Sequence, residues 1–355
     1  MSGGWADGFA LLPMPLVCEN SAVSLLKRGG RMDQAEFARI VENVAMALSV
    51  HNAQPARWRL VDGQIWVAHD LIMQLPHADP AGDGIGLSCG AAVEAACLAL
   101  SAAGYGSQVQ DVWRHDDQTT WPGHRMVAVI TLETSGKIDP LAQQLEQRFT
   151  WRGAFDGDVP MLYGWTRADT VLVMDMPQRT WLGTLNDSAS LRILAQHGFR
   201  HELLSWMRLS DDHPRVRYDG MARRAAGMKP AQARSFCWGG GELWPWLHLL
   251  GRTSRMTPQS DVTLIAPILA CFHRPKTESP VTSGCAYLRF WLEATSLGLA
   301  GWPMAGLTDD ADARSEICAN HSIPQDHKLI QVIRLGQPTG PRPPQARRPL
   351  SELIP

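Results

Sequence analysis

The stretch ALSVHNAQPARWRL, from 47 to 60, places three polar side chains and a helix breaker at the end of an apolar segment. His51, Asn52 and Gln54 lie within four positions, directly before Pro55. Each amide side chain offers donors and an acceptor, so the pair could bind the edge of a planar ligand. The alternative is a helix that ends there with solvent-exposed polar residues. Taken alone, the cluster does not decide between the two interpretations.

Two arginine clusters further along the chain could bind an anion. Arg148 and Arg152 are four residues apart, with Thr150 between them. Two planar guanidinium groups and a hydroxyl can together bind a phosphate. Arg347 and Arg348 lie in a proline-rich C-terminal stretch. A solvated basic helix end and an ordinary basic tail are the alternatives for these two clusters.

The sequence lacks the markers of several common enzyme classes. GxGxxG between a strand and a helix, GxxxxGK[ST] and HExxH are all absent, so dinucleotide-Rossmann, P-loop and zincin enzymes lack support. GLSCG (86–90) matches the GxSxG pattern, but a loop-like stretch precedes it where a nucleophile elbow needs a strand. We interpret Ser88 as part of a helix start. The acidic pairs at 211–212 and 309–310 are expected to be solvated, and no metal site is predicted.

Apolar periodicity predicts a series of helices and strands along the chain. The clearest helix covers 33–50, where Asp33 and Glu36 form a capping-box pattern before an apolar face. Further helices are predicted at 90–103, 139–148, 187–208 and 285–297, and strands at 64–68, 126–132, 170–174, 262–272 and 329–335.

Two of these predicted helices resemble each other. A single offset pairs Gly90 with Gly284 and Gly104 with Gly298, and a hydrophobic strand follows each copy. A duplicated α+β unit explains this pattern, and two unrelated buried helices of similar composition are the alternative. We divide the chain into an N-terminal extension (1–32), a first half (33–135), a second half (136–335) with a lid-like insertion around 209–260, and a C-terminal extended arm (336–355).

The bulk composition favours a globular protein that binds a small molecule. The chain has 355 residues, 45% of them hydrophobic, and a formal net charge of -2, which gives no reason to expect a nucleic-acid or membrane partner. Seven scattered cysteines without a C-x-x-C pair are typical of a reducing compartment. The apolar run 9–18 lacks a preceding basic region and contains two prolines, and no later segment is expected to span a membrane. We therefore expect a cytoplasmic protein.

Taken together, five segments resemble the FMN-dependent nitroreductase superfamily, and more narrowly its Acg-like branch, in which one chain carries two nitroreductase-like halves. The resemblance covers roughly residues 35–355 and keeps the family's order of motifs. The matching segments are SVHNAQP, similar to PSxHNxQPW; RFTWRGAF, similar to RRTxRRPF; WMRLSDDHPRVRYDGM, similar to a lid segment; GLAGWPMAGLTDD, similar to GLxxxPIxGFD; and RRPLSEL, similar to a terminal arginine motif.

The resemblance implies a duplicated nitroreductase-like α+β fold with mixed or antiparallel sheets packed with helices. One chain would function as a pseudo-dimer, with further oligomerisation left open. FMN is the implied cofactor, and the implied reaction transfers hydride or electrons through flavin N5 between a reductant, expected to be NAD(P)H, and a small organic acceptor that could be aromatic. Because the flavin carries the chemistry, no catalytic side chain is assigned.

The resemblance also implies where the cofactor binds. The arginines and Thr150 would hold the phosphate and ribityl oxygens, and Asn52 and Gln54 would hold the ring edge. The backbone of Ala305 and Gly306 would offer donors near N5, while His51 would shape the site or donate a hydrogen bond. The implied cofactor-binding residues are His51, Asn52, Gln54, Arg148, Thr150, Arg152, Pro303, Met304, Ala305, Gly306, Arg347 and Arg348.

The chain departs from the family pattern at several positions. Ala56 stands where the family usually has a tryptophan, and Trp58 follows two positions later. Phe149 and Trp151 replace residues that are more polar in the branch, and Ala305 occupies a position that is often acidic. These departures affect the residues that tune the flavin and face the substrate.

Two further functions are compatible with the sequence. A lid closed over the flavin would make the chain a non-catalytic flavin-binding or flavin-storing protein. A pathway-specific FMN-dependent dehydrogenase acting on a natural-product intermediate could use Trp238, Trp244 and Trp246 as an aromatic pocket, although a packed lid or interface segment is an alternative role for these tryptophans.

Overall fold

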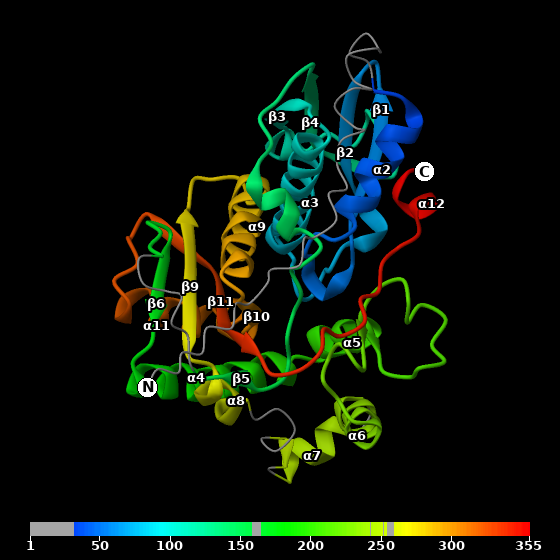
Figure 1. The fold of residues 1–355 in the computed structure, drawn as a ribbon. Coiled ribbons are helices and arrows are strands. Elements are labelled where there is room, and N and C mark those ends of the chain that lie inside the picture. The colour runs from blue at the N-terminus through cyan, green and yellow to red at the C-terminus, as the bar shows by residue number, and fades with distance from the viewer. Residues whose placement is uncertain (1–31, 158–164, 242, 251, 254–258) are drawn as a thin grey trace, which may run out of the picture.

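A computed structural model describes residues 32–157, 165–241, 243–250, 252–253 and 259–355. In these ranges the chain forms two larger antiparallel sheets, each covered by helices, and one short parallel pair of strands (Figure 1). The prediction of an α+β fold with antiparallel sheets packed with helices is therefore confirmed. Of the predicted N-terminal extension, residues 1–31 lie outside the described ranges.

The first sheet contains four antiparallel strands in the order β1-β2-β4-β3. Ile65 and Val67 of β2 point into a core that α2 and α3 cover. Helix α3 is made largely of small apolar residues, so it can be buried on most of its surface. It is long and apolar enough to cross a membrane, yet 78% of that segment is buried inside the protein, as expected of a core helix. The elements are α2 (Gln34–Val44), β1 (Ala56–Val61), β2 (Gln64–Asp70), α3 (Asp83–Ala102), β3 (Gly106–Asp111) and β4 (His124–Glu133).

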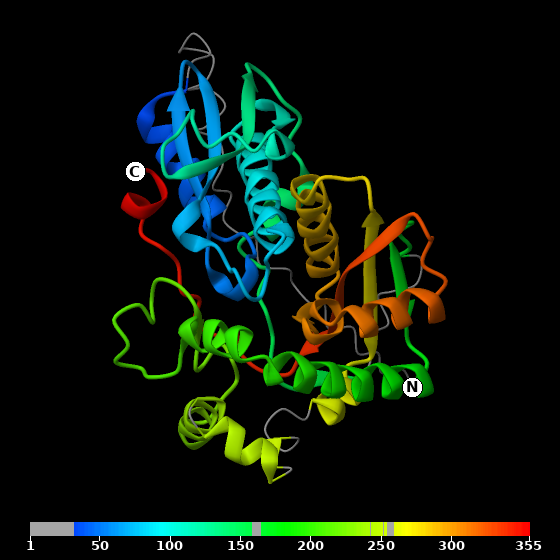
Figure 2. The same ribbon diagram turned by 180° about the vertical axis from the view of Figure 1, so that it is seen from behind.

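The second sheet has the path β10-β11-β9-β6, and β5 pairs with the end of β11. Alternate residues of β9 pack into two different cores. Phe272 packs with helix α9, and Leu269 packs into the core that α4, α10 and α11 cover. Figure 2 shows α4 running along one edge of this half. The elements are β5 (Phe155–Asp156), β6 (Thr170–Val173), α4 (Met176–Ala195), α8 (Ser260–Ile265), β9 (Ile268–Pro275), α9 (Pro280–Ser296), β10 (Ala300–Pro303), α10 (Gly306–Asp309), α11 (Ala311–Asn320) and β11 (His327–Pro338).

The two sheets share one strand order, because β6-β9-β11-β10 repeats β1-β2-β4-β3, with a buried helix after the second strand in each half. These helices, α3 and α9, pack against each other between the sheets (Figures 1 and 2). A Cβ on Gly90 would lie 1.9 Å from the carbonyl oxygen of Val281, and one on Gly284 would lie 2.1 Å from that of Leu87. The spacing from Gly90 to Gly284 equals that from Leu87 to Val281, so the contact is reciprocal, as at a two-fold interface.

The insertion and the arm connect the two halves. The arm leaves β11, runs as extended chain, and places the short helix α12 against α2 and β1 (Figure 1). Leu353 is buried there. The segment predicted as an extended arm, 336–355, instead begins as part of β11 and ends as the helix α12. The remaining elements are α5 (His197–Ser205), β7 (Met207–Arg208), β8 (Met221–Ala222), α6 (Pro230–Gly240), α7 (Trp244–Leu249), α12 (Leu350–Leu353) and 3₁₀ helices at Val50–Asn52, Leu71–Met73, Trp113–His115 and Pro140–Gln144.

Several predicted elements were wrong in extent or type. The helix predicted at 33–50 ends at Val44, although its capping box forms as predicted. The segment 139–148 forms only a 3₁₀ helix, and 187–208 is divided between α4 and α5 because Gln196 is extended. The strand predicted at 262–272 begins as helix α8, which ends at Ile265 because the residue before Pro267 is held in an extended conformation.

Candidate functional site

A cavity of about 600 Å³ lies between the two halves. Its volume is in the range of sites that bind a cofactor or a small molecule. The walls come from the turn after α2, the start of α3, residues 148–152, the insertion, α9, α10 and the arm. The structure therefore brings together segments that are up to about 300 residues apart in the sequence. The predicted site residues that line the cavity are His51, Asn52, Arg148, Thr150, Arg152, Pro303, Ala305 and Arg347.

Four other predicted site residues lie behind this lining. Met304 is buried in the second core, and Gly306 is pressed against α4, where a Cβ would lie 2.5 Å from Ser190 Oγ. Arg348 is buried and forms ion pairs with the carboxylates of the insertion and of α12. Gln54 lines a separate, small apolar pocket.

The backbone of the turn that carries His51 is strained. His51, Asn52 and Gln54 have φ values of 48°, 55° and 52°, in the left-handed region that residues other than glycine rarely adopt. Each such residue costs roughly 1–2 kcal/mol. Strained backbone of this kind clusters at functional sites, where the surrounding structure holds it in place. The segment that follows α2 is therefore a strained turn whose conformation the surrounding structure specifies.

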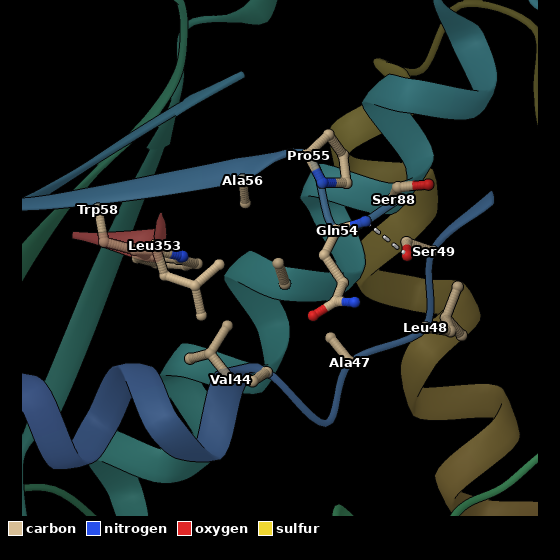
Figure 3. Close-up of a pocket in the computed structure, with 12 residues that line it drawn as sticks. Val44, Ala47, Leu48, Ser49, Gln54, Pro55, Ala56, Trp58, Ser88 and Leu353 are labelled. Atoms are coloured by element: carbon tan, nitrogen blue, oxygen red, sulfur yellow. Dashed lines mark hydrogen bonds between the residues drawn. The ribbon is translucent and has the colours of Figure 1, made fainter. Parts of the chain in front are cut away.

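Hydrogen bonds from neighbouring elements hold this turn. The backbone N–H of Val50 donates to Ser88 Oγ at 2.9 Å, and that hydroxyl donates to the carbonyl of Gly84. Figure 3 shows Gln54 beside the small pocket, with its backbone N–H donating to Ser49 Oγ at 3.1 Å. Ser88 lies inside α3 rather than at its start, and its hydroxyl serves the turn, so no structural feature makes it a nucleophile.

The side chains of Asn52 and Gln54 fasten the insertion and the arm to the turn. Asn52 Nδ2 donates to the carbonyls of Gly220 and Ala346 at 3.2 and 3.1 Å. Gln54 Nε2 donates to the carbonyl of Tyr218, and Gln54 Oε1 accepts from the backbone N–H of Arg348. Both amides already have partners on each side. They therefore position the cavity walls, and they would have to exchange partners in order to contact a ligand.

An ion-pair network centred on a buried carboxylate lies in the same region. Asp219 accepts hydrogen bonds from the guanidinium groups of Arg208, Arg215 and Arg348, and it is itself 2% exposed. Glu352 of α12 pairs with Arg215 and Arg348. The network joins the insertion to the arm, so the segment predicted as a lid is anchored at the cavity wall.

Three arginines from residues 148–152 and the arm line the cavity without a counter-ion. Arg148, Arg152 and Arg347 form no salt bridge with any described carboxylate, and they donate instead to the oxygens of Met46, Ala225 and Asn52. Burial lowers the pKa of Arg148 and Arg152 to about 10 each. Burial, together with Arg148 and Arg342, lowers the pKa of Arg347 to about 9. Uncompensated buried charge is costly, so an anion bound among these guanidinium groups would stabilise the site.

Several residues that line the cavity carry a buried polar atom without a partner. Ten buried side-chain nitrogen or oxygen atoms in the described ranges lack a hydrogen-bond partner, and five of them belong to cavity-lining residues. Buried polar groups normally have partners, so this concentration indicates a site for a polar ligand. The five atoms are His51 Nε2, Arg148 Nε, Tyr287 Oη, Trp291 Nε1 and Arg347 Nε.

Tyr287 and Trp291 are site residues that the sequence analysis missed. Both lie on α9, four residues apart, and each is only 2% exposed. The guanidinium of Arg148 lies 4.9 Å from the centre of the Trp291 ring, so these residues belong to the arginine-rich part of the cavity. The only signal in the sequence is a pair of aromatic residues with polar tips at helical spacing within an apolar helix.

His51 is held neutral. Its side chain is buried, and this desolvation, reinforced by the positive charge of Arg152, lowers its pKa to about 4. In a neutral imidazole, Nε2 can act either as a donor or as an acceptor. His51 can therefore bind a polar ligand without adding charge to the arginine cluster.

The tryptophans of the insertion lie elsewhere. Trp238 and Trp246 are 75% and 67% exposed, and Trp244 is buried in a small cluster with α4 and α5. None of them lines the cavity. Trp58, which follows Ala56, is buried in the first core, so it does not replace the missing tryptophan at the cavity.

Comparison with known proteins gives a distant but full-length similarity. No family model matches the chain. Two Mycobacterium tuberculosis proteins, each named "Putative NAD(P)H nitroreductase", are 26% identical to it over 340 residues, which cover 90% of this chain and 91% of the relative.

Similar solved structures include a "putative nitroreductase" from Anabaena variabilis, with 11% identity, 92% and 94% coverage of the two chains and a TM-score of 0.45. The FMN-dependent nitroreductase NfnB from Mycobacterium smegmatis, in complex with NADPH, has 22% identity, 60% and 97% coverage and a TM-score of 0.33. These TM-scores are too low to transfer a residue role. Over about nine-tenths of its length the chain is thus similar in sequence to two proteins named as putative NAD(P)H nitroreductases.

Proposed function

We propose that the chain is an FMN-binding oxidoreductase of the nitroreductase type, acting between NAD(P)H and a small organic acceptor. The observation that carries this proposal is the cavity lined by these three arginines without a counter-ion and by five residues that each have an unpartnered buried polar atom. A ligand with an anionic group at one end and further polar atoms along its length would satisfy both. FMN has this chemistry, and the residues present fit it.

The arginine-rich part of the cavity would hold the phosphate. Arg148, Arg152 and Arg347 supply the positive charge, and Thr150 adds a hydroxyl in the cavity wall. Tyr287 and Trp291 add two buried donors in the same region. Because these groups come from three separate segments, the folded chain fixes their positions before any ligand arrives.

A second part of the lining, at His51 and Ala305, would hold the ring. The backbone N–H groups of Ala305 and of Gly306 behind it donate to no acceptor among the described residues, and His51 has an unpartnered ring nitrogen. Donors at such positions stabilise negative charge on a bound group. When bound, FMN supplies the hydride transfer itself, and the side chains described here orient it and exclude water.

We also propose that the two halves arose from one duplicated unit and act as an internal pseudo-dimer. The repeated strand order and the reciprocal contacts of Gly90 and Gly284 support this proposal. The cavity then corresponds to a site at a subunit interface, built here within a single chain. This explains why its walls draw on both halves.

The direct test is FMN binding by variants, followed by quenching of flavin fluorescence. Arg148→Ala combined with Arg152→Ala removes two of the three unpaired charges, and we expect a loss of affinity of at least about a hundredfold, since hydrogen bonds to charged groups contribute roughly 1.5–3 kcal/mol each. Arg39→Ala, at an exposed position of α2, is the matched control and should bind like the wild type. Unchanged binding by the double variant would show that the phosphate lies elsewhere.

A flavin-storing protein is the second candidate, favoured by the anchored insertion. The network around Asp219 and the amide contacts of Asn52 and Gln54 hold the cavity wall closed against the arm. If this wall never opens, NAD(P)H will not bleach the bound flavin. Bleaching by NAD(P)H and recovery with a quinone would support the oxidoreductase, whereas stoichiometric flavin that never turns over would support storage.

A further inference from the structure

Asp309 is a cavity residue for which the proposed cofactor site gives no role. It is the last residue of α10 and lies one helical turn after Ala305, to whose carbonyl its backbone N–H donates at 2.9 Å. Both residues line the cavity. The sequence analysis expected this carboxylate to be solvated in a loop; the structure shows it exposed, at the end of a short helix that lines the cavity.

The carboxylate of Asp309 has no hydrogen bond or ion pair with any described residue, whereas the charged groups around it are engaged. Asp79 accepts from the backbone N–H of Ile85 at 2.7 Å. Asp83 pairs with Lys328 at 3.2 Å. Arg314 donates to the carbonyl of Thr308. These four charged groups come from the segment before α3, α3 itself, β11 and α11, and all of them line the same cavity.

The surroundings of Asp309 favour its protonated form. Its side chain is open to the cavity but is otherwise crowded by protein, and this desolvation, together with the negative charge of Asp79, raises its pKa to about 7. Arg314 acts in the opposite direction without cancelling the effect. A carboxylic acid that exchanges its proton near neutral pH suits general acid catalysis.

We propose that Asp309 donates a proton to the acceptor as that acceptor is reduced in the cavity. The proposal rests on the proposed function. For a quinone acceptor, FMN bound in the cavity and reduced by NAD(P)H would supply a hydride, which would convert the quinone to a hydroquinone anion. The O–H bond of Asp309 would break as its proton moves to the anionic oxygen, giving the hydroquinone. The carboxylate would then take up a proton from bulk solvent, so that the quinone gains one hydride and one proton in all.

The kinetic test is the reoxidation of the NAD(P)H-reduced holoenzyme by a quinone, followed across a pH range by stopped-flow absorbance. In the wild type, the reoxidation rate should fall as pH rises through about 7, where Asp309 loses its proton. Asp309→Asn should react at least about tenfold more slowly at low pH, at the lower end of what a general acid contributes, and should lose this pH dependence. Asp312→Asn, an exposed carboxylate on α11, is the matched control and should keep the wild-type profile.

A second readout needs no cofactor. Because the pKa of Asp309 is raised from 3.8 to about 7, the folded protein holds a proton that the unfolded chain has released between these pH values. The stability of the wild type should therefore fall, relative to that of Asp309→Asn, as pH rises through this window. Thermal unfolding of the cofactor-free proteins measures this difference. A difference that does not change with pH would overturn the titration on which the proposal depends.

The outcomes separate the two proposals. If the wild type binds no flavin, the proposed function fails and the proton donor fails with it, while a pH-dependent stability difference would still show that Asp309 titrates. If flavin binds and NAD(P)H reduces it, but Asp309→Asn reoxidises at the wild-type rate and with the wild-type profile, the function survives and the assignment of Asp309 is wrong.

Discussion

At the scale of single residues, the site is defined by polar groups whose partners are missing. The sequence indicated His51 and the arginines that we propose to bind an anion, because their types and spacing carry a chemical meaning without the fold. It could not indicate Tyr287, Trp291 or Asp309, since the sequence of an apolar helix or of an acidic pair does not show which residues line a cavity.

Tyr287→Phe should affect binding and stability in opposite directions. The variant removes a buried hydroxyl that has no partner in the cofactor-free protein, so the unfolding temperature should stay the same or rise. It also removes a donor to the ligand, and FMN affinity should fall by roughly threefold to tenfold, as expected for one hydrogen bond. Calorimetry and flavin fluorescence measure the two effects. A lower melting temperature with unchanged affinity would mean that the hydroxyl is structural.

His51 should make the protein sensitive to acid. Its pKa is about 4 in the folded state and near 6.5 when unfolded, so the unfolded chain binds an extra proton between these values and stability falls as pH drops through the window. His51→Asn, a residue that tolerates the left-handed backbone, should reduce this loss by on the order of 3 kcal/mol. Urea unfolding at several pH values measures it. His69, whose pKa is also about 4, should keep part of the dependence in the variant.

At the scale of elements, the sequence predicted the buried helices and strands and missed polar or short ones. Strand β3 carries mainly polar residues at the edge of the first sheet, and β1 carries two arginines, so neither shows a clear apolar alternation. The strained turn was anticipated only as a helix end, because its positive φ values depend on bonds from Ser88, the insertion and the arm.

The insertion and the arm should loosen together when their buried network is broken. Asp219→Asn leaves Arg208 buried without a carboxylate and leaves Arg348 with Glu352 alone, and the loss of one partner of a buried pair costs roughly 3–5 kcal/mol. Limited proteolysis should then cut within the insertion and near the C-terminus at lower protease concentration. Asp212→Asn, at an exposed position of the same insertion, should leave the cleavage pattern unchanged.

At the scale of the whole molecule, the central packing of α3 against α9 holds the two halves in register around the cavity. The sequence suggested a repeat from the alignment of these helices, and the shared strand order is the additional observation that only the fold provides. The cavity could be anticipated only from the order of the motifs, because its walls come from both halves.

Gly90→Ala and Gly284→Ala should each disrupt this packing. In both, the new Cβ would clash with a backbone carbonyl oxygen that cannot move without shifting the other helix. We expect a loss of stability of a few kcal/mol in each variant, as for other overpacked cores, measured by chemical unfolding. Gly183→Ala in α4, where the nearest atom is 3.3 Å from the added Cβ, is the control and should be tolerated. Tolerance at Gly90 and Gly284 would contradict the reciprocal close approach.

The central claim is that the cavity between the halves binds FMN, and the visible absorption spectrum of the purified protein, recorded before and after incubation with FMN and removal of unbound flavin, tests it most directly. The account predicts oxidised-flavin bands that remain with the wild type and are lost from the variant that combines Arg148→Ala with Arg152→Ala. A wild-type protein that stays colourless after this incubation would contradict it.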